Sequence, residues 1–271
     1  MFVLQIKIGG HSFLADRYTY IAYFGLFFIY AYGFQWLLEN YEKYDKLIYL
    51  VVFLILGVLG YLNFEQNKIW KNGETLWSHE IKFYPWLYTA WEHRAYYYKE
   101  EGRFKEALYD YNKTIAISPY TANAYYNRGI TYAQLNMFDN ALQDLDTTES
   151  LLSSPSPTVF YERSKIYITL NQYDKAEPEI EKYLNLKPSN SDMWANLGKV
   201  SRLNKQYDKS LDAFNRAIQI NPNKLDYYYD RSIIFYERGD IREARNDIKF
   251  LKSKGFKDIN PDFEKRLDRG M

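Results

Sequence analysis

The stretch "AYYNRGITYAQLNMFDNALQDL", residues 124–145, places an Arg-Gly pair on one helical segment and an aspartate on the next. The arginine, Arg128, stands where a helix that packs against another helix would ordinarily carry a leucine. A buried charge is costly unless an opposite charge accompanies it. The stretch therefore predicts two packed helices joined by an ion pair between Arg128 and Asp144.

Units of this kind recur after residue 87 with a period of about 34 residues and one extra residue between the second and third units. Small residues stand at fixed positions on both segments of each unit, and they allow two antiparallel helices to approach closely. On the first segments they are Ala95, Gly129, Ser164, Gly198 and Ser232, and on the second Ala107, Ala141, Ala176, Ser210 and Ala244. Aromatic residues fill the space between successive units, which accounts for much of the excess of 29 tyrosines.

This order of large, small and aromatic residues with a closing proline resembles the tetratricopeptide repeat. The resemblance implies an α-solenoid, a right-handed superhelix of helix pairs in which each unit buries its apolar face against the next. The expected repeats are 88–121, 122–156, 157–190, 191–224 and 225–255. Residues 67–87 are expected to form a degenerate half-repeat that acts as a linking helix, and residues 256–271 a charged C-terminal cap.

Arginine and an acid occur together within the repeats. Four of the five units carry an arginine just before the small position, and the same four carry an acid sixteen residues later. The fourth unit has Leu197 and Ala213 instead. This rule predicts an ion pair between the two helices of one repeat, bidentate where the geometry permits. The predicted pairs are Arg94–Asp110, Arg128–Asp144, Arg163–Glu179 and Arg231–Asp247.

The N-terminal part of the chain has a different composition. Residues 18–38 and 47–64 contain no charged residue, and each run is long enough to cross a bilayer as a helix. The sequence therefore predicts an all-α chain in which a two-helix membrane hairpin, residues 18–66, follows an extramembrane segment, residues 1–17. A pair of buried core helices is the alternative. Two spans place both ends of the hairpin on one side, and the lysines on its flanks leave the orientation open.

Binding in helical-repeat arrays usually involves the concave face formed by the first helix of each unit. Tyrosines beside lysines on this face could grip a protein or peptide, or stack on a sugar ring, although the same rings could also pack against neighbouring helices. The two-lysine, two-asparagine clamp that some repeats use for a C-terminal carboxylate is not apparent. The predicted groove residues are Glu92, Tyr96, Lys99, Tyr126, Ile130, Tyr161, Lys165, Lys199, Arg202, Tyr229 and Tyr236.

Composition argues against several other classes of function. The chain has no cysteine, which excludes disulfides, thiol catalysis and cysteine-ligated metal sites. Its three histidines lack metal-ligand spacing, so neither a metal nor a cofactor is expected. The formal charge of +1 without basic clustering disfavours nucleic acid as a partner. No catalytic residue is predicted.

A second resemblance covers nearly the whole chain. The motif Ala-Asp-Arg-Tyr before the first apolar run, followed by Trp70, Trp77 and the repeats, resembles the C-terminal part of the repeat-bearing, O-mannosyltransferase-like membrane proteins. This resemblance implies that the repeats lie on the extracytoplasmic side. It also implies that Asp16 and Arg17 lie at the membrane surface, where Arg17 could hold a lipid-linked phosphate or serve as an interfacial anchor. The family's acidic catalytic loop is missing from these residues.

Two functions follow from the sequence. The favoured one is a membrane-anchored scaffold that binds protein partners through its repeats. The alternative is the acceptor-binding part of a polyprenyl-phosphate-sugar-dependent protein O-glycosyltransferase, which would handle a glycan or a lipid-linked sugar and would not be catalytically complete alone. The sequence does not specify the ligand or the oligomeric state.

Overall fold

The computed structural model of the chain describes residues 5–8, 11–14 and 19–269, with side chains described for residues 28–65 and 67–267. The chain divides into two compact units, Met1–Lys71 and Asn72–Met271. The division falls at the short connection between the apolar N-terminal helices and the first helix of the repeat region. Each unit has its own internal packing.

The first unit contains a short β-hairpin. Strand β1 (Gln5–Ile8) pairs antiparallel with β2 (His11–Leu14), and Ile6 lies opposite Phe13. The expectation of an all-α chain is wrong for this segment. Its sequence alternates polar and apolar residues on either side of two glycines, a pattern that favours a hairpin over a helix.

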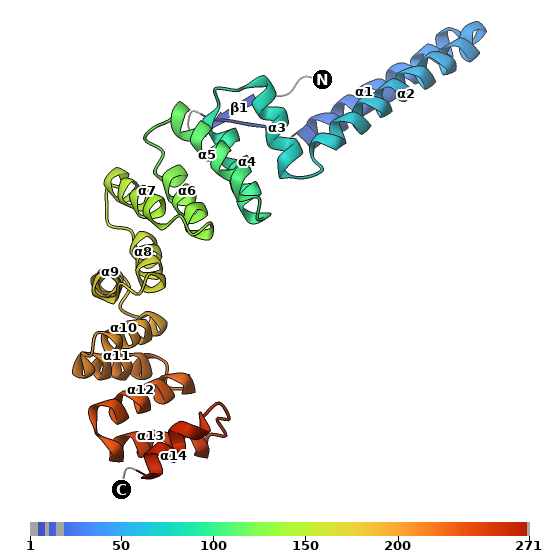
Figure 1. Cartoon of the computed structure of the whole chain (residues 1–271). Coiled ribbons are helices and arrows are strands. Elements are labelled where there is room, and N and C mark those ends of the chain that lie inside the picture. Colours follow the sequence, from blue (N-terminus) through green and yellow to red (C-terminus); the bar gives the residue numbers. More distant parts are fainter. Residues whose placement is uncertain (1–4, 9–10, 15–18, 270–271) are drawn as a thin grey trace. The chain divides into compact units, whose positions relative to one another are not determined.

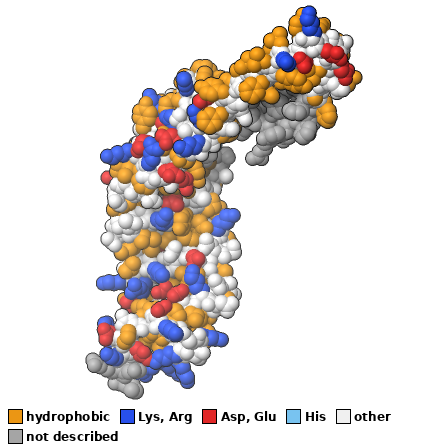
Figure 2. Space-filling view, turned by 90° about the vertical axis from the view of Figure 1, so that its right-hand side faces the viewer, with side chains coloured by type: hydrophobic (Ala, Val, Ile, Leu, Met, Phe, Trp, Pro, Cys, Tyr) orange, Lys and Arg blue, Asp and Glu red, His pale blue; other side chains and the backbone are white. Residues whose placement is uncertain are grey.

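Two long helices form the rest of the first unit. Helix α1 (Thr19–Asn40) is followed by the 3₁₀ turn η2 (Glu42–Tyr44) and by α2 (Asp45–Ile69). The helices lie side by side in Figure 1, and the rings of Phe34 and Tyr49 meet edge to face at 5.7 Å. Hydrophobic side chains cover the visible face of this hairpin in Figure 2, and charged side chains gather at its tip.

The apolar character of α2 is the clearest property of this hairpin. Among the described residues, the stretch Glu42–Ile69 is the one helix long and apolar enough to cross a membrane, and its 18-residue apolar window has a mean hydropathy of 2.4. None of its apolar window is buried in the protein.

The second unit is a stack of helix pairs (Figure 1), in which the two helices of a pair pack on each other and each pair packs on the next. The first helices of the five pairs begin at Tyr88, Ala122, Pro157, Ser191 and Leu225, the residues at which the sequence units start. The helices are α3 (Gly73–Phe83), α4 (Tyr88–Glu100), α5 (Phe104–Ile117), α6 (Ala122–Gln134), α7 (Phe138–Leu151), α8 (Pro157–Thr169), α9 (Tyr173–Leu186), α10 (Ser191–Leu203), α11 (Tyr207–Ile220), α12 (Leu225–Arg238), α13 (Ile241–Ser253) and α14 (Pro261–Arg269).

Each pair turns between its helices through one residue with positive φ. These residues occupy the same repeat position in the five units, and they are Gly102, Asn136, Asn171, Lys205 and Gly239. Glycine and asparagine tolerate this left-handed conformation better than other residues, and it ends a helix by turning the chain away from the axis. Lys205 is the exception, with φ of 61°, so the fourth unit carries a small backbone strain at this turn.

Close approach of the paired helices depends on the small residues. Gly198 shows this most clearly, because a Cβ added to it would lie 2.4 Å from the ring of Phe214 on the partner helix. Phe214 is fully buried and fills the space that the glycine leaves open. At the C-terminal end, Leu267 of α14 is buried against Leu251 and its neighbours on α13, so α14 closes the last apolar face of the stack.

Candidate functional site

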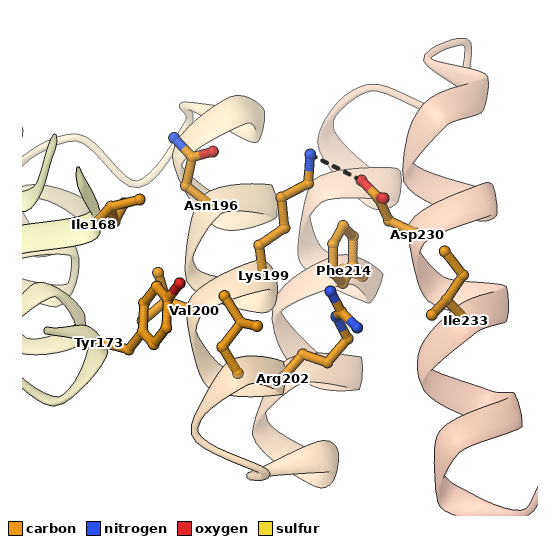
Figure 3. Close-up of a pocket in the computed structure, with 10 residues that line it drawn as sticks. Ile168, Tyr173, Asn196, Lys199, Val200, Arg202, Phe214, Asp230 and Ile233 are labelled. Carbon is orange, nitrogen blue, oxygen red and sulfur yellow. Dashed lines mark ion pairs between the residues drawn. The ribbon is translucent and has the colours of Figure 1, made fainter. Parts of the chain in front are cut away.

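A cavity of about 400 Å³ opens among the first helices of the third, fourth and fifth repeats. Figure 3 shows its lining side chains, which come mainly from α8, α10 and α12. The lining residues are Ile168, Tyr173, Asn196, Lys199, Val200, Arg202, Leu203, Phe214, Asp230 and Ile233. Most of them stand on the first helices of the repeats, and two of them, Lys199 and Arg202, are among the predicted groove residues.

The base of this cavity is apolar. Val200 and Phe214 are buried, and the half-buried Ile168 and Ile233 stand on the flanking helices. Phe214 reaches this position from α11 because Gly198 leaves space for its ring between the two helices. A ligand side chain of moderate size that enters the cavity would bury its apolar surface here. This burial would contribute roughly 25 cal/mol of binding free energy per Å² of apolar surface.

Ion pairs form the polar edge of the cavity. Lys199 Nζ lies 3.1 Å from Asp230 Oδ2, and the lysine side chain is 54% exposed. Arg202 Nη1 donates to Glu237 Oε1 at 2.8 Å. Both pairs join α10 to α12, so they fix the spacing of two adjacent first helices while leaving donors at the surface. Exposed pairs of this kind contribute little to stability, and their charges remain available to a ligand.

The predicted groove residues at the N-terminal end form a separate group. Tyr96 is about half exposed, and Lys99 Nζ lies 4.4 Å from the centre of its ring. Lys99 also donates to Asn127 Oδ1 at 3.1 Å, which links α4 to α6. Burial raises the pKa of the half-buried Glu92 above its ordinary value.

The central groove residues are only partly accessible. Tyr126 is half-buried, and this burial raises the pKa of its hydroxyl. Ile130 is also half-buried. Tyr161 is exposed, with Lys165 Nζ 5.2 Å from its ring, and Lys165 pairs with Glu162 on the same helix at 3.0 Å.

Tyr229 and Tyr236 pack against the C-terminal segment. The ring of Tyr229 contacts Phe256 and Phe263, and Tyr236 contacts Phe263 at 5.5 Å between ring centres. The Tyr229 hydroxyl also accepts a hydrogen bond from the backbone N–H of Asn260. Both tyrosines therefore hold the C-terminal cap, and the packing alternative applies to them.

Sequence reasoning identified only Lys199 and Arg202 among the residues that line the cavity. It missed Asn196 and Asp230, which occupy one repeat position, immediately before the arginine or leucine of the ion-pair rule. Asn127 occupies the same position in the second repeat and contacts Lys99. A search for polar residues at this single position would have found them.

The predicted intra-repeat pairs lie between the helices of each unit. Arg94 donates to both oxygens of Asp110 at 2.7 and 2.9 Å, and Arg128 to both oxygens of Asp144 at 2.7 Å. Arg231 and Asp247 form the same fork at 2.9 and 2.7 Å. Burial alone would lower the pKa of the Arg128 guanidinium, but its hydrogen bonds to Asp144 raise it.

Each of these three arginines also reaches the preceding unit, which the sequence rule did not include. The acceptor is always the residue sixteen positions earlier on the preceding helix. Arg94 Nη1 donates to Ser78 Oγ at 2.9 Å, Arg128 Nη1 to Asn112 Oδ1 at 2.6 Å, and Arg231 Nη1 to Asn215 Oδ1 at 2.7 Å. The arginines thus join three helices and couple neighbouring repeats.

Arg163 departs from this arrangement. It lies 3.5 Å from Glu179 and makes shorter contacts with Asp146 at 2.6 Å and Glu149 at 2.5 Å, both on α7. The other oxygen of Glu179 is bound by Lys182 at 2.7 Å. The extra residue between the second and third units and this competing lysine account for the loss of the bidentate pair.

The remaining sequence hypotheses concern the N-terminal half. Asp16 and Arg17 lie outside the described residues. Trp77 stacks on His93 with 4.6 Å between ring centres, so it packs α3 against α4. Within the part of the chain that the structure describes, no cluster of histidine and acidic side chains could hold a metal ion.

Comparison with known proteins identifies the repeats. Residues 95–136 match a TPR repeat model, and residues 157–190 and 191–224 match tetratricopeptide repeat models. Human tetratricopeptide repeat protein 13 is 24% identical over 159 residues, 57% of this chain and 18% of that protein. The TPR repeat-containing protein MJ1428 of Methanocaldococcus jannaschii is 35% identical over 71 residues, 26% of this chain and 12% of that protein. The chain thus spans less than a fifth of these relatives' length.

Solved structures show the same fold. YrrB, described as a TPR protein with an unusual peptide-binding site, superposes with a TM-score of 0.58 at 17% identity, over 64% of this chain and 89% of that one. MamA from Desulfovibrio magneticus superposes with a TM-score of 0.57 at 17% identity, over 64% and 97%. The prediction of a tetratricopeptide-repeat solenoid is confirmed. None of these findings supports the resemblance to O-mannosyltransferase-like proteins.

Proposed function

Because the chain is built on tetratricopeptide repeats, we propose that it is a scaffold that binds an extended segment of a protein partner along the first helices of its repeats. The partner places an apolar side chain in the cavity among α8, α10 and α12. Its backbone and polar side chains meet Asn196, Lys199 and Arg202 at the edge. The proposal makes the protein a binding module and not an enzyme.

The observation that carries this proposal is the composition of the cavity. Its apolar base and polar edge match the needs of a peptide, which has to bury one or two side chains while keeping its backbone hydrogen-bonded. The walls belong to packed helices of the repeat stack, so they are in place before a ligand arrives, which lowers the entropic cost of binding. YrrB, which has the same fold, carries a peptide-binding site by its description.

Membrane attachment forms the second part of the proposal. The α1–α2 hairpin inserts into a bilayer and anchors the repeats at its surface. The support comes from α2, whose exposed apolar length satisfies the dimensions of a hydrocarbon core. Following the family resemblance stated above, we place the repeats on the extracytoplasmic side. The glycosyltransferase reading stays a prediction from sequence, since its residues Asp16 and Arg17 lie outside the described chain.

Selection of peptides from a random display library on the full chain in detergent tests the groove. A selected peptide should lose at least tenfold in affinity with Ile233→Glu, which places a charge at the apolar base. Lys199→Glu, a change at an exposed edge residue, should weaken binding without affecting the fold. Ile220→Glu, at the end of α11 and away from the cavity, is the matched control and should bind as the wild type does.

The proposal fails if peptides are selected whose binding is unaffected by both groove variants. It also fails if the Ile220→Glu control loses affinity to the same extent. Circular dichroism of each variant separates a loss of binding from a loss of fold.

A further inference from the structure

The fourth repeat lacks the arginine and the acid that its sister repeats carry, and a second cavity of about 400 Å³ lies at that place. Leu197 and Ala213, the two replacements, both line it. It opens between α9, α10 and α11, whereas the cavity of the proposed function is walled mainly by the first helices α8, α10 and α12. The lining residues are Glu181, Leu184, Asn185, Trp194, Leu197, Lys209, Asp212, Ala213 and Arg216.

The sister repeats show what chemistry this position accommodates. The first, second and fifth repeats have a bidentate arginine–aspartate pair. In these three repeats, the aromatic residue three positions before the arginine lies beneath its guanidinium. The guanidinium carbon is 5.0 Å from the ring centre of Trp91 for Arg94. The distance is 5.4 Å for Arg128 over Tyr125 and for Arg231 over Tyr228. In the third repeat, Lys182 supplies the cation over Phe160 at 5.5 Å.

The fourth repeat keeps the aromatic residue without the cation. Trp194 is oriented by a hydrogen bond from Nε1 to the carbonyl oxygen of Pro188 at 2.8 Å, as Trp91 is by Pro85 at 2.9 Å. In the described part of the chain, no lysine or arginine lies over the ring of Trp194, although its counterpart in each sister repeat has one. An indole face is the aromatic surface that attracts cations most strongly.

The acceptor for the guanidinium is also present. Sixteen residues before Leu197 stands Glu181, in the position where Ser78, Asn112 and Asn215 accept a hydrogen bond from the sister arginines. A carboxylate at this position binds a guanidinium more strongly than an amide or a hydroxyl does. Asp212 adds a second carboxylate to the lining.

Two cationic side chains, Lys209 and Arg216, also line the cavity. A cationic ligand can bind only where they leave a carboxylate oxygen and the aromatic ring unoccupied. Lys209 bonds the buried Glu177 and lies 2.5 Å from Glu181, so it is engaged by two carboxylates. Arg216 occupies the repeat position of Lys182 but does not lie over the aromatic ring. One oxygen of Glu181 has no partner in the described part of the chain. Trp194 is half-buried against the apolar cores beside α10 and also contributes to the cavity lining, where a planar cation could reach it.

We propose that this cavity binds an arginine side chain of a protein partner, whose guanidinium takes the place that an internal arginine occupies in the sister repeats. The guanidinium stacks on Trp194 and bonds to Glu181, while its aliphatic stem contacts Leu197 and Ala213. This site lies between α9 and α11 and would be a second contact point of the scaffold. Arginine binding here does not require peptide binding in the cavity among α8, α10 and α12.

Titration with N-acetylarginine amide, followed through the indole N–H resonances of the full chain, tests this site. The chain has six tryptophans, so single substitutions can assign the signals of Trp194 and Trp91. The Trp194 signal should shift and saturate, with half-saturation at about 1–10 mM for a single residue. Trp91, whose ring is already covered by Arg94, is the internal control and should not shift. N-acetyllysine amide should bind more weakly, because it lacks the planar fork.

The Leu197→Arg, Ala213→Asp double variant converts the fourth repeat into the sister type. It should remain folded and should abolish the shift of Trp194, because the internal arginine then fills the cavity. The Ile233→Glu groove variant should keep the shift, which separates this site from the proposed function. The assignment is overturned if Trp194 does not respond to the arginine amide, if Trp91 responds equally, or if N-acetylnorleucine amide or N-acetylaspartate amide produces the same shift.

Discussion

Arg128 connects three helices through one guanidinium. It bonds both oxygens of Asp144 on α7 and one oxygen of Asn112 on α5, while its plane faces two tyrosine rings. The side chains of Arg128 and Asp144 are 17% and 6% exposed. A pair of this kind does not stabilise through charge alone, because both groups lose hydration on burial. Its main consequence is that each partner depends on the other.

This dependence predicts a non-additive mutational cycle. Arg128→Leu and Asp144→Ala should each lower the free energy of unfolding by roughly 3 kcal/mol, because each leaves a buried charge without its partner. The double variant, which reproduces the Leu197 and Ala213 combination of the fourth repeat, should cost far less than the sum. Urea denaturation of the four proteins measures this. Purely additive losses would contradict the pairing.

Tyr111 gives a second prediction at the scale of a residue. Its side chain is fully buried, and its hydroxyl oxygen has no hydrogen-bond partner in the described part of the chain. Burial raises the pKa of this hydroxyl far above its ordinary value. Tyr111→Phe should therefore leave stability unchanged or increase it by up to about 1 kcal/mol.

The matched control for this change is Tyr98→Phe. Tyr98 is also buried, but its hydroxyl donates to Glu74 Oε1 at 3.0 Å. Removal of the Tyr98 hydroxyl should lower the free energy of unfolding by about 1 kcal/mol, since Glu74 then loses a hydrogen-bond donor. Thermal denaturation distinguishes the two variants, and a larger loss for Tyr111→Phe than for Tyr98→Phe would contradict this account.

The sequence was informative about residues wherever spacing within one unit decides a contact. The sixteen-residue interval between Arg128 and Asp144 follows from two helices of similar length and one tight turn. The contacts of Arg163 could not be predicted in the same way, because the extra residue before the third unit changes how α7 and α8 meet. The cation-free ring of Trp194 could not be predicted either, because the contact between guanidinium and ring in the sister repeats is a feature of the folded structure.

At the scale of elements, α3 is the first helix after the N-terminal unit, and the five repeats follow it in the chain. Asn72 caps it, accepting a hydrogen bond from Thr75 N at 2.9 Å, while the Thr75 hydroxyl accepts from Asn72 N at 3.2 Å. This capping box starts the helix directly after the boundary between the two units. Glu74 then joins α3 to Arg103, which lies just before α5, at 2.7 Å.

The Glu74 contact predicts how this element responds to acid. The hydrogen bond from Arg103 holds the pKa of Glu74 below its ordinary value of 4.5, against the opposing effect of burial. A group with a lowered folded-state pKa stabilises the protein above its unfolded-state pKa, and this contribution is lost as the pH falls through the folded-state value. The stability difference between wild type and Glu74→Gln should therefore be present at pH 6 and disappear in more acidic solution.

Urea denaturation of both proteins at a series of pH values measures this difference. Glu106→Gln is the comparison variant. Arg103 lowers the pKa of Glu106 as well, but Glu106 lies three residues from Arg103 and does not reach α3, so its difference from wild type should follow the same pH trend and be smaller at pH 6. A difference between wild type and Glu74→Gln that stays constant from pH 6 into the acidic range would contradict the assignment.

Helix positions were predictable because two signals agree in every repeat, the 34-residue period and the small residues of the close helix contact. Four of the five repeats add a glycine or asparagine at the turn, and the fourth has Lys205 there. The β1–β2 hairpin was not predicted, because its alternating pattern is short. Its two strands span only four residues each, so they give a much weaker periodic signal than a helix.

At the scale of the whole molecule, the absence of cysteine makes the membrane proposal directly testable. Lys7→Cys, Lys43→Cys and Lys71→Cys each introduce a single thiol, before α1, between the two helices and after α2. A membrane-impermeant maleimide added to sealed vesicles should label Lys7→Cys and Lys71→Cys from one side and Lys43→Cys from the other. The same experiment assigns the side on which the repeats lie.

Other labelling patterns have clear meanings. Labelling of Lys7→Cys on the side of Lys43→Cys would leave α2 as a single span and overturn the hairpin. Equal labelling of all three from one side would contradict insertion altogether. Permeabilised vesicles, in which all three thiols should react, provide the control for accessibility.

The central claim is that a peptide lies across the first helices of the third to fifth repeats. Hydrogen–deuterium exchange of the full chain, with and without a library-selected peptide, tests it most directly. We predict slower exchange in α8, α10 and α12, strongest around Lys199 and Ile233, with α5 and α7 unchanged. Protection confined to the second helices of the repeats, or absent from α10 and α12, would contradict the claim.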